Sequence, residues 1–251
     1  MARRPRIYCP PPLVEGELAT LPESAARHIS KVLRLAAGDS LRIFDGAGRE
    51  HEAQLAAGGP GTRALVGAPL EPLPESDLRI TLIQGISRGE RMDWVVQKAT
   101  ELGVVRIVPV QTARSVVRLN PERGRQRHRH WLGVAASACE QCGRSSLPDV
   151  MMPQRLADAV SEETAVGLRL MPDTVASAAL SAQTPEDGCL TLLIGPEGGL
   201  EDEEKALAER HGFVSIGLGP RVLRTETAAV VAVTACQLLW GDLSANPQSA
   251  D

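Results

Sequence analysis

The fold can be inferred best from one stretch of the 251-residue chain, residues 190–228, which reads LTLLIGPEGGLEDEEKALAERHGFVSIGLGPRVLRTETA. Two apolar runs, Leu190–Ile194 and Val214–Leu218, predict buried strands, and each is followed by a loop that contains glycine. A helix is expected from about Asp202 to His211, because acidic residues begin it and a glycine follows it. This order of elements is typical of a parallel α/β sheet.

The same alternation extends upstream as far as residue 77. Further strands are expected at Leu78–Gln84, Val104–Val110 and Ala165–Leu170, and further helices at Arg91–Leu102, at about Glu122–Cys142 and at about Thr227–Leu239. The predicted fold class is therefore α/β, with a mostly parallel sheet covered by helices on both faces. Such sheets bind ligands at the carboxyl ends of their strands, which directs attention to the loops after Leu170, Ile194 and Leu218.

The first 70 residues follow another pattern, with short elements separated by glycine-rich turns. The expected elements are one helix, Ser24–Leu35, and β-prone runs at Leu41–Asp45, Glu52–Leu55 and Arg63–Val66. Short strands of this kind favour a small β-barrel. The proline-rich run PLEPLPES, residues 69–76, interrupts both helix and strand and marks a domain boundary. We therefore expect a barrel domain over 1–70, an α/β domain over 77–243 and a disordered tail over 244–251.

Composition excludes several classes of protein. With 43% hydrophobic and 23% charged residues, the chain has the balance of a soluble globular protein rather than a disordered or fibrous one. Its most apolar stretch, Ala228–Trp240, falls short of the ~20 residues that a membrane-spanning helix needs. The first residues, MARRPRIYCPPPLV, lack the apolar core of a secretion signal, and five irregularly spaced cysteines form no disulfide framework. A cytoplasmic protein with no membrane partner is expected.

Charge is segregated along the chain, although the net charge is only −4. Residues 79–130 contain eleven Lys or Arg against four Asp or Glu, whereas residues 145–210 contain four against thirteen. Almost all the basic residues are arginines, whose planar fork suits phosphate groups, and such clustering is typical of nucleic-acid binders. Solvated helix faces in an arginine-rich protein are the alternative. With only six aromatic residues, recognition of RNA by stacking on an aromatic sheet is not expected.

The loop Ile194–Leu200, with sequence IGPEGGL, has the composition of a tight turn that lets backbone approach a ligand closely. A phosphate-binding loop would continue with Lys and Ser or Thr, but four acidic residues, 201–204, follow instead. A nucleotide enzyme of the P-loop kind is therefore disfavoured, and the loop suits a ligand without phosphates. A plain turn is the alternative.

The segment Ile216–Ala228 fails as a dinucleotide fingerprint, because Val222 replaces the third glycine of the pattern. It places Arg221, Arg224 and Glu226 between a buried strand and an apolar helix, where charges are costly unless they pair or act on a ligand. The alternative for Glu226 is an ordinary acid at a helix start.

The pair Cys139 and Cys142 is the one sequence feature that suggests a metal. Zinc needs about four ligands, and no second cysteine pair exists in the sequence. At this spacing both thiols lie on one helical face, where buried cysteines serve as small apolar groups. No metal is therefore expected.

Five segments, in their order along the chain, resemble one family. They are HISKVLRLAAGD, LIQGISRGERMDWVVQKATELGV, ACEQCGR, LLIGPEGGL and LGPRVLRTETA. The family is that of SPOUT-class RsmE-type methyltransferases, which methylate N3 of a uridine in small-subunit (16S) ribosomal RNA. The resemblance extends from Arg6 to about Trp240, with small departures at Leu200 and Glu201, where Phe and Ser are common.

The resemblance implies an N-terminal PUA-like barrel for RNA and a C-terminal SPOUT domain with a deep trefoil knot. It also implies a homodimer, S-adenosylmethionine as cofactor, and ribosomal RNA or the assembled small subunit as partner. The implied cofactor-binding residues are Leu170, Pro172, Ile194, Gly195, Pro196, Glu197, Gly198, Gly199, Leu218, Gly219, Leu223, Thr227 and Ala228.

For catalysis, we expect Arg224, helped by Arg144, to stabilise the anion at uridine N3, while Glu226 orients Arg224 or acts as a base. The basic stretches supply the expected RNA contacts, which are His28, Lys31, Arg34, Arg88, Arg91, Lys98, Arg114 and Arg118. Two alternatives stay open, namely a related enzyme that acts on another RNA base and a catalytically silent protein that binds RNA or the ribosome.

Overall fold

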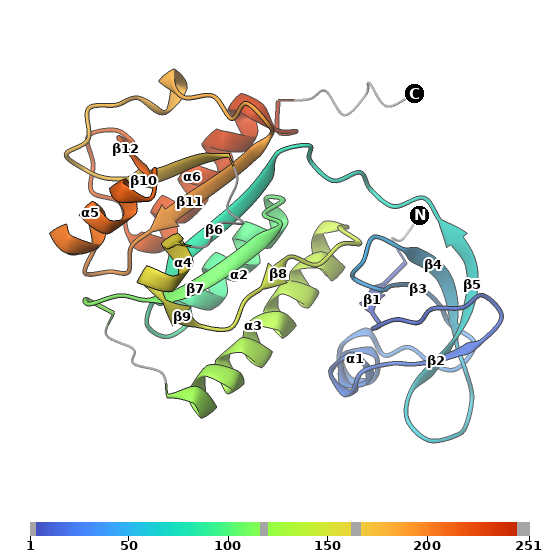
Figure 1. Cartoon of the computed structure of the whole chain (residues 1–251). Coiled ribbons are helices and arrows are strands. Elements are labelled where there is room, and N and C mark those ends of the chain that lie inside the picture. Colours follow the sequence, from blue (N-terminus) through green and yellow to red (C-terminus); the bar gives the residue numbers. More distant parts are fainter. Residues whose placement is uncertain (1–3, 116–119, 162–166, 245–251) are drawn as a thin grey trace. The chain divides into compact units, whose positions relative to one another are not determined.

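A computed structural model describes residues 4–115, 120–161 and 167–244 of the chain (Figure 1). It divides into two compact units, one of residues 1–75 with 135–147 and the other of residues 76–134 with 148–251. Most of the expected tail, 245–251, lies outside the described residues.

The N-terminal unit is built on a curled five-stranded sheet (Figure 1). The strand order is β1 (Arg6–Tyr8), β3 (Ser40–Phe44), β4 (Glu50–Leu55), β5 (Arg63–Leu70) and β2 (Leu18–Thr20). The three strands predicted from sequence are present as β3, β4 and β5. The strands β1 and β2 have three residues each, too few for alternation of apolar and polar residues to reveal them. Buried side chains such as Ile7, Leu41 and Ile43 form the core.

The helix expected over Ser24–Leu35 is shorter and changes type. The α-helix α1 (Glu23–His28) continues as a single π-helical segment, Ile29–Leu33, and Arg34 then adopts a left-handed backbone with φ of 54°. Three expected RNA contacts, His28, Lys31 and Arg34, therefore share no regular helical face, because the wider π turn and the reversal at Arg34 break the helical periodicity. All three side chains are exposed.

The N-terminal unit also holds the end of helix α3 (Pro121–Cys142), which the boundary predicted from proline does not anticipate. Arg6 explains this, since its side chain is only 4% exposed and pairs with Glu50 at 2.7 Å. The same guanidinium donates to the carbonyl oxygens of Cys139 and Arg144, at 2.6 and 3.1 Å. These contacts tie the last turn of α3, and the residue two positions beyond its end, to the N-terminal sheet.

The C-terminal unit contains one sheet in which each pairing of strands is parallel. Its order is β12 (Val214–Ile216), β10 (Leu168–Pro172), β11 (Cys189–Ile194), β6 (Arg79–Gly85), β7 (Arg106–Gln111) and β8 (Asp149–Val150), with β9 (Gln154–Arg155) also beside β7. The predicted α/β class with a mostly parallel sheet is confirmed. The trefoil knot implied by the resemblance stays a prediction.

Helices cover both faces of this sheet (Figure 1). On one face, α4 (Leu156–Ser161) and α5 (Asp202–Arg210) pack on a buried cluster that includes Ile83 and Leu193. On the other, α2 (Arg91–Glu101) packs against α6 (Thr225–Trp240). A single 3-10 turn, Leu180–Ala182, precedes β11. None of the described helices has the length and apolar character needed to cross a membrane.

Candidate functional site

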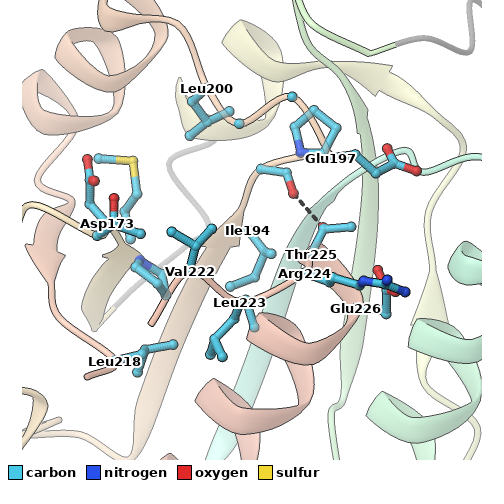
Figure 2. A pocket seen from close by; sticks show the side chains of 18 of the residues that line it. Asp173, Ile194, Glu197, Leu200, Leu218, Val222, Leu223, Arg224, Thr225 and Glu226 are labelled. Atoms are coloured by element: carbon cyan, nitrogen blue, oxygen red, sulfur yellow. Dashed lines mark hydrogen bonds between the residues drawn. The ribbon is translucent and has the colours of Figure 1, made fainter. Parts of the chain in front are cut away.

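A cavity of about 620 Å³ opens at the carboxyl ends of β10, β11 and β12, which are adjacent in the sheet (Figure 2). The loops that follow three neighbouring parallel strands surround a common space, as the sequence predicted. The predicted residues that line it are Pro172, Ile194, Gly195, Pro196, Glu197, Gly198, Gly199, Leu218, Gly219, Leu223, Arg224, Glu226 and Ala228. The structure adds Met171, Asp173, Thr174, Leu200, Lys205, Arg221, Val222 and Thr225, and it brings in Arg91 and Arg114.

The loop after β11 depends on glycine for close approach of backbone. A β-carbon on Gly198 would lie 2.9 Å from the β-carbon of Arg114, and Gly199 has a φ of +71°. One on Gly85, at the end of β6, would lie 2.4 Å from the backbone nitrogen of Pro196. The acids that follow the loop serve the helix, because Glu201 and a second glutamate form a capping box at the start of α5.

Glu197 connects this loop to the start of α2. Its carboxylate accepts hydrogen bonds from the backbone N–H of Arg88 and from Nη1 of Arg91, both at 2.9 Å. Burial opposes ionisation of Glu197, but these bonds and the charge of Arg91 outweigh it and lower the pKa of the carboxyl. Arg91, expected as an RNA contact, is therefore an ion-paired residue at the cavity.

A second ion pair lies on another side of the cavity, where Lys205 contacts Asp173 at 2.7 Å (Asp173 is labelled in Figure 2). Burial again opposes ionisation, and the hydrogen bond from Lys205 together with backbone donors lowers the pKa of Asp173. Arg114 donates to the carbonyl of Gly198 at 3.1 Å and approaches Glu201 at 3.7 Å. The wall of the cavity is therefore rich in charges that are already paired.

The segment that begins α6 differs, because its two arginines lack such partners. Arg221 and Arg224 are exposed, and neither side chain forms an ion pair among the described residues. The Oε2 atom of Glu226 is buried without a hydrogen-bond partner in the described part of the chain, and its Oε1 is 3.9 Å from Nε of Arg91. Figure 2 labels Arg224, Thr225 and Glu226 at the start of α6. The two arginines are therefore available to a ligand.

Several predicted residues lie elsewhere. Leu170 is fully buried in β10, and neither it nor Thr227 lines the cavity. Arg144 belongs to the N-terminal unit, where it pairs with Glu75 at 2.8 Å. It does not line the cavity, so its expected role beside Arg224 stays a prediction.

The expected RNA contacts outside the cavity are also dispersed. Lys98 pairs with Glu101 at 2.8 Å. Arg88 is exposed, and Arg118 lies outside the described residues. The described residues contain no group of three or more His, Cys, Asp or Glu that would hold a metal ion.

Family models match both parts of the chain. A model described as an RNA methyltransferase domain matches residues 74–237, and one described as an RNA methyltransferase PUA domain matches residues 21–62. Among curated proteins, the ribosomal RNA small subunit methyltransferase E of Buchnera aphidicola is 32% identical, over 96% of this chain and 99% of its own. That of Bacillus subtilis is 33% identical, over 86% and 89%.

Solved structures agree with these matches. A ribosomal RNA small subunit methyltransferase E from Neisseria gonorrhoeae, crystallised with S-adenosyl methionine, superposes with a TM-score of 0.87 at 36% identity and covers 96% of this chain and 100% of its own. A protein from Legionella pneumophila in complex with the cofactor SAM gives a TM-score of 0.90 at 39% identity, with the same coverage. The chain therefore belongs to the RNA methyltransferase family that includes the ribosomal RNA small subunit methyltransferase E proteins.

Proposed function

We propose that this protein transfers a methyl group from S-adenosylmethionine to N3 of a uridine in small-subunit (16S) ribosomal RNA, in the cytoplasm. The observation that carries the proposal is the cavity at the ends of β10, β11 and β12, whose volume of about 620 Å³ is that of a small-molecule site. Two related proteins with the same fold hold the cofactor in their crystals, and one of them is named for small-subunit ribosomal RNA, as the Buchnera relative is.

The residues present fit this cofactor. It has no phosphate, and the loop Gly195–Gly199 offers close-packed backbone followed by acids that cap α5. When bound, S-adenosylmethionine supplies a methyl group on a positively charged sulfur. Glu197 and Asp173 add carboxylate acceptors to the wall of the cavity, where Arg91 and Lys205 pair with them.

Arg224 is the proposed electrostatic catalyst. Methyl transfer forms the N3–CH₃ bond and breaks the S–CH₃ bond, and N3 must lose its proton before or during the step. The unpaired guanidinium of Arg224 would stabilise negative charge on the imide, an effect worth about 2.7–4 kcal/mol by analogy with single oxyanion donors. Glu226 is the acceptor proposed for the N3 proton, since its Oε2 has no hydrogen-bond partner among the described residues, although Oε1 lies 3.9 Å from Nε of Arg91.

The N-terminal unit is proposed to help bind the RNA, consistent with the PUA match over 21–62 and the exposed His28, Lys31 and Arg34. Arg114 and Arg221 at the cavity, and Arg88 outside its lining, are the proposed phosphate contacts, because each is exposed. Such contacts make binding dependent on salt.

We also propose a homodimer. Helix α6 exposes Val231, Leu238 and Leu239 by 38%, 51% and 48%, and Leu243 beyond it by 46%. Several exposed apolar side chains along one helix are typical of a protein interface. Light scattering of the purified protein would give twice the chain mass, and Leu238→Glu would halve it; a monomeric wild type would reject the dimer.

The test of function is methyl transfer by purified protein to small-subunit RNA, free or assembled, followed by mass mapping of the nucleosides. We expect 3-methyluridine, and about a 10²- to 10³-fold loss of kcat in Arg224→Ala with unchanged cofactor affinity. Arg210→Ala is the matched control, an exposed arginine outside the cavity. Methylation of another base would indicate a related enzyme with a different RNA target. Cofactor binding without transfer to any RNA would reject the proposal.

A further inference from the structure

We propose that Thr225 and Gln84 are positioning residues that hold the loop Gly195–Gly199 and the segment Arg224–Glu226 in one fixed geometry. The inference rests on the function proposed above. It concerns two side chains that the sequence did not single out, neither of which carries a charge.

The contact is a short chain of hydrogen bonds. The hydroxyl Oγ1 of Thr225 lies 2.6 Å from the carbonyl oxygen of Gly195, the dashed line in Figure 2. The amide Nε2 of Gln84 lies 3.0 Å from the same hydroxyl and 3.1 Å from the carbonyl oxygen of Gly85. Gln84 is fully buried and Thr225 is 7% exposed, so water does not compete for these bonds.

The direction of each bond is fixed by chemistry. Carbonyl oxygens only accept, so the single hydroxyl proton of Thr225 goes to Gly195, and its oxygen accepts from Gln84. The second amide proton of Gln84 goes to Gly85 for the same reason. This orientation leaves Oε1 of Gln84 buried with no hydrogen-bond partner among the described residues. Burying an acceptor without a partner costs free energy, which the two bonds from Nε2 offset in part.

These hydrogen bonds connect the two parts of the proposed site, the glycine loop Gly195–Gly199 and the segment Arg224–Glu226. Gln84 pairs with Ile194 across β6 and β11, directly before the glycine loop. Thr225 stands between Arg224 and Glu226 and is the first residue of α6. A β-carbon on Gly85 would also collide with Pro196, so strand and loop are already in contact there. The hydrogen bonds therefore set how far the charged groups lie from the loop that lines the cofactor side of the cavity.

The expected consequence is a defect in turnover rather than in binding. A misplacement of about 1 Å in an active site costs about 10²-fold in rate. We therefore expect Thr225→Val, which keeps the shape of the side chain but removes both bonds, to lower kcat by about 10- to 100-fold with a smaller change in KM for either substrate. Thr225→Ser, which restores the hydroxyl, should recover most of the activity.

A double-mutant cycle separates positioning from loss of stability. If Thr225 acts through Arg224, then Thr225→Val added to Arg224→Ala should lower kcat by much less than it does alone. Thr100→Val is the matched control, because Thr100 is also fully buried and its hydroxyl also donates to a carbonyl, that of Val96, away from the cavity. It should destabilise the fold and leave kcat unchanged. Gln84→Met serves as a second test should Thr225→Val fail to fold.

Two results would overturn the inference. One is a folded Thr225→Val enzyme with wild-type kcat; the other is a loss in kcat that simply multiplies with that of Arg224→Ala. A wild-type protein that transfers no methyl group to RNA would instead overturn the proposed function on which the inference rests.

Discussion

Two arginine–glutamate pairs, one in each unit, show how differently the same residues are used. Arg6 and Glu50 are 4% and 5% exposed, and Arg6 also donates to two carbonyls and to a serine hydroxyl. Arg91 and Glu197 are 46% and 23% exposed, at the rim of a cavity. The Arg6–Glu50 pair makes its hydrogen bonds inside the protein, whereas the Arg91 guanidinium of the second pair is partly exposed to solvent.

The difference indicates which arginines are available to RNA. A charge count along the sequence treats Arg6, Arg91 and Arg221 alike. In the structure the first is structural, the second holds the glycine loop through Glu197, and the third has no ion-pair partner among the described residues. We therefore expect the exposed arginines to contribute to RNA binding and the buried Arg6 to contribute to the stability of the fold.

The largest effect is expected from breaking the buried pair. Arg6→Ala removes the closest partner of the buried Glu50 and leaves it only Arg42 at 3.8 Å and the hydroxyl of Ser145, which should lower the free energy of unfolding by about 3–5 kcal/mol. Arg91→Ala, at an exposed pair, should lower it by less than about 1 kcal/mol. Urea unfolding of both variants measures the contrast, and equal losses would contradict it.

The buried pair should also make stability depend on acid pH. Burial opposes ionisation of Glu50, but bonds from Arg6 and Ser145 outweigh it and lower the pKa of its carboxyl below the ordinary 4.5. A lowered pKa contributes stability that is complete above pH 4.5 and is lost as the pH falls through the folded value. Unfolding measured between neutral pH and pH 3 should show this loss, and Glu50→Gln should remove that part of it.

A smaller effect is expected at the exposed pair of Arg91 and Glu197. Glu197→Gln removes the charge that holds Arg91 and the backbone of Arg88, which should loosen the glycine loop. Cofactor affinity should fall by about 3- to 10-fold, as the loss of one hydrogen bond of ordinary net strength, about 0.5–1.5 kcal/mol, would give. Calorimetric titration measures it. Glu203→Gln, in the first turn of α5 and outside the cavity, is the control and should bind as wild type does.

The smallest effect concerns salt. Arg221→Ala should reduce the slope of log affinity for RNA against log salt by about one, because an unpaired phosphate contact is lost. Arg91→Ala should reduce it less, since Glu197 already neutralises Arg91 in the free protein. Filter binding across a range of salt concentrations compares the two. Equal slopes in wild type and Arg221→Ala would reject the contact.

The sequence was enough to predict the structure where neighbouring residues determine it. The glycine and proline of Gly195–Gly199, set directly after an apolar run, predicted both the loop and its place at a strand end. It did not suffice where residues distant in sequence meet. The bonds from Gly195 to Thr225 and from Glu197 to Arg91 span 30 and 106 residues, and no local pattern encodes them. Nor did periodicity reveal the left-handed Arg34, since a non-glycine residue rarely adopts that backbone.

The central claim is that the cavity beside α6 binds S-adenosylmethionine, and calorimetric titration tests it most directly. Wild-type protein should bind one molecule per chain, and Ala228→Trp, which fills the cavity, should abolish the heat. Ala235→Trp, two turns along the same helix and outside the cavity, should bind as wild type does. Undiminished binding by Ala228→Trp, or no binding by the wild type, would contradict the account.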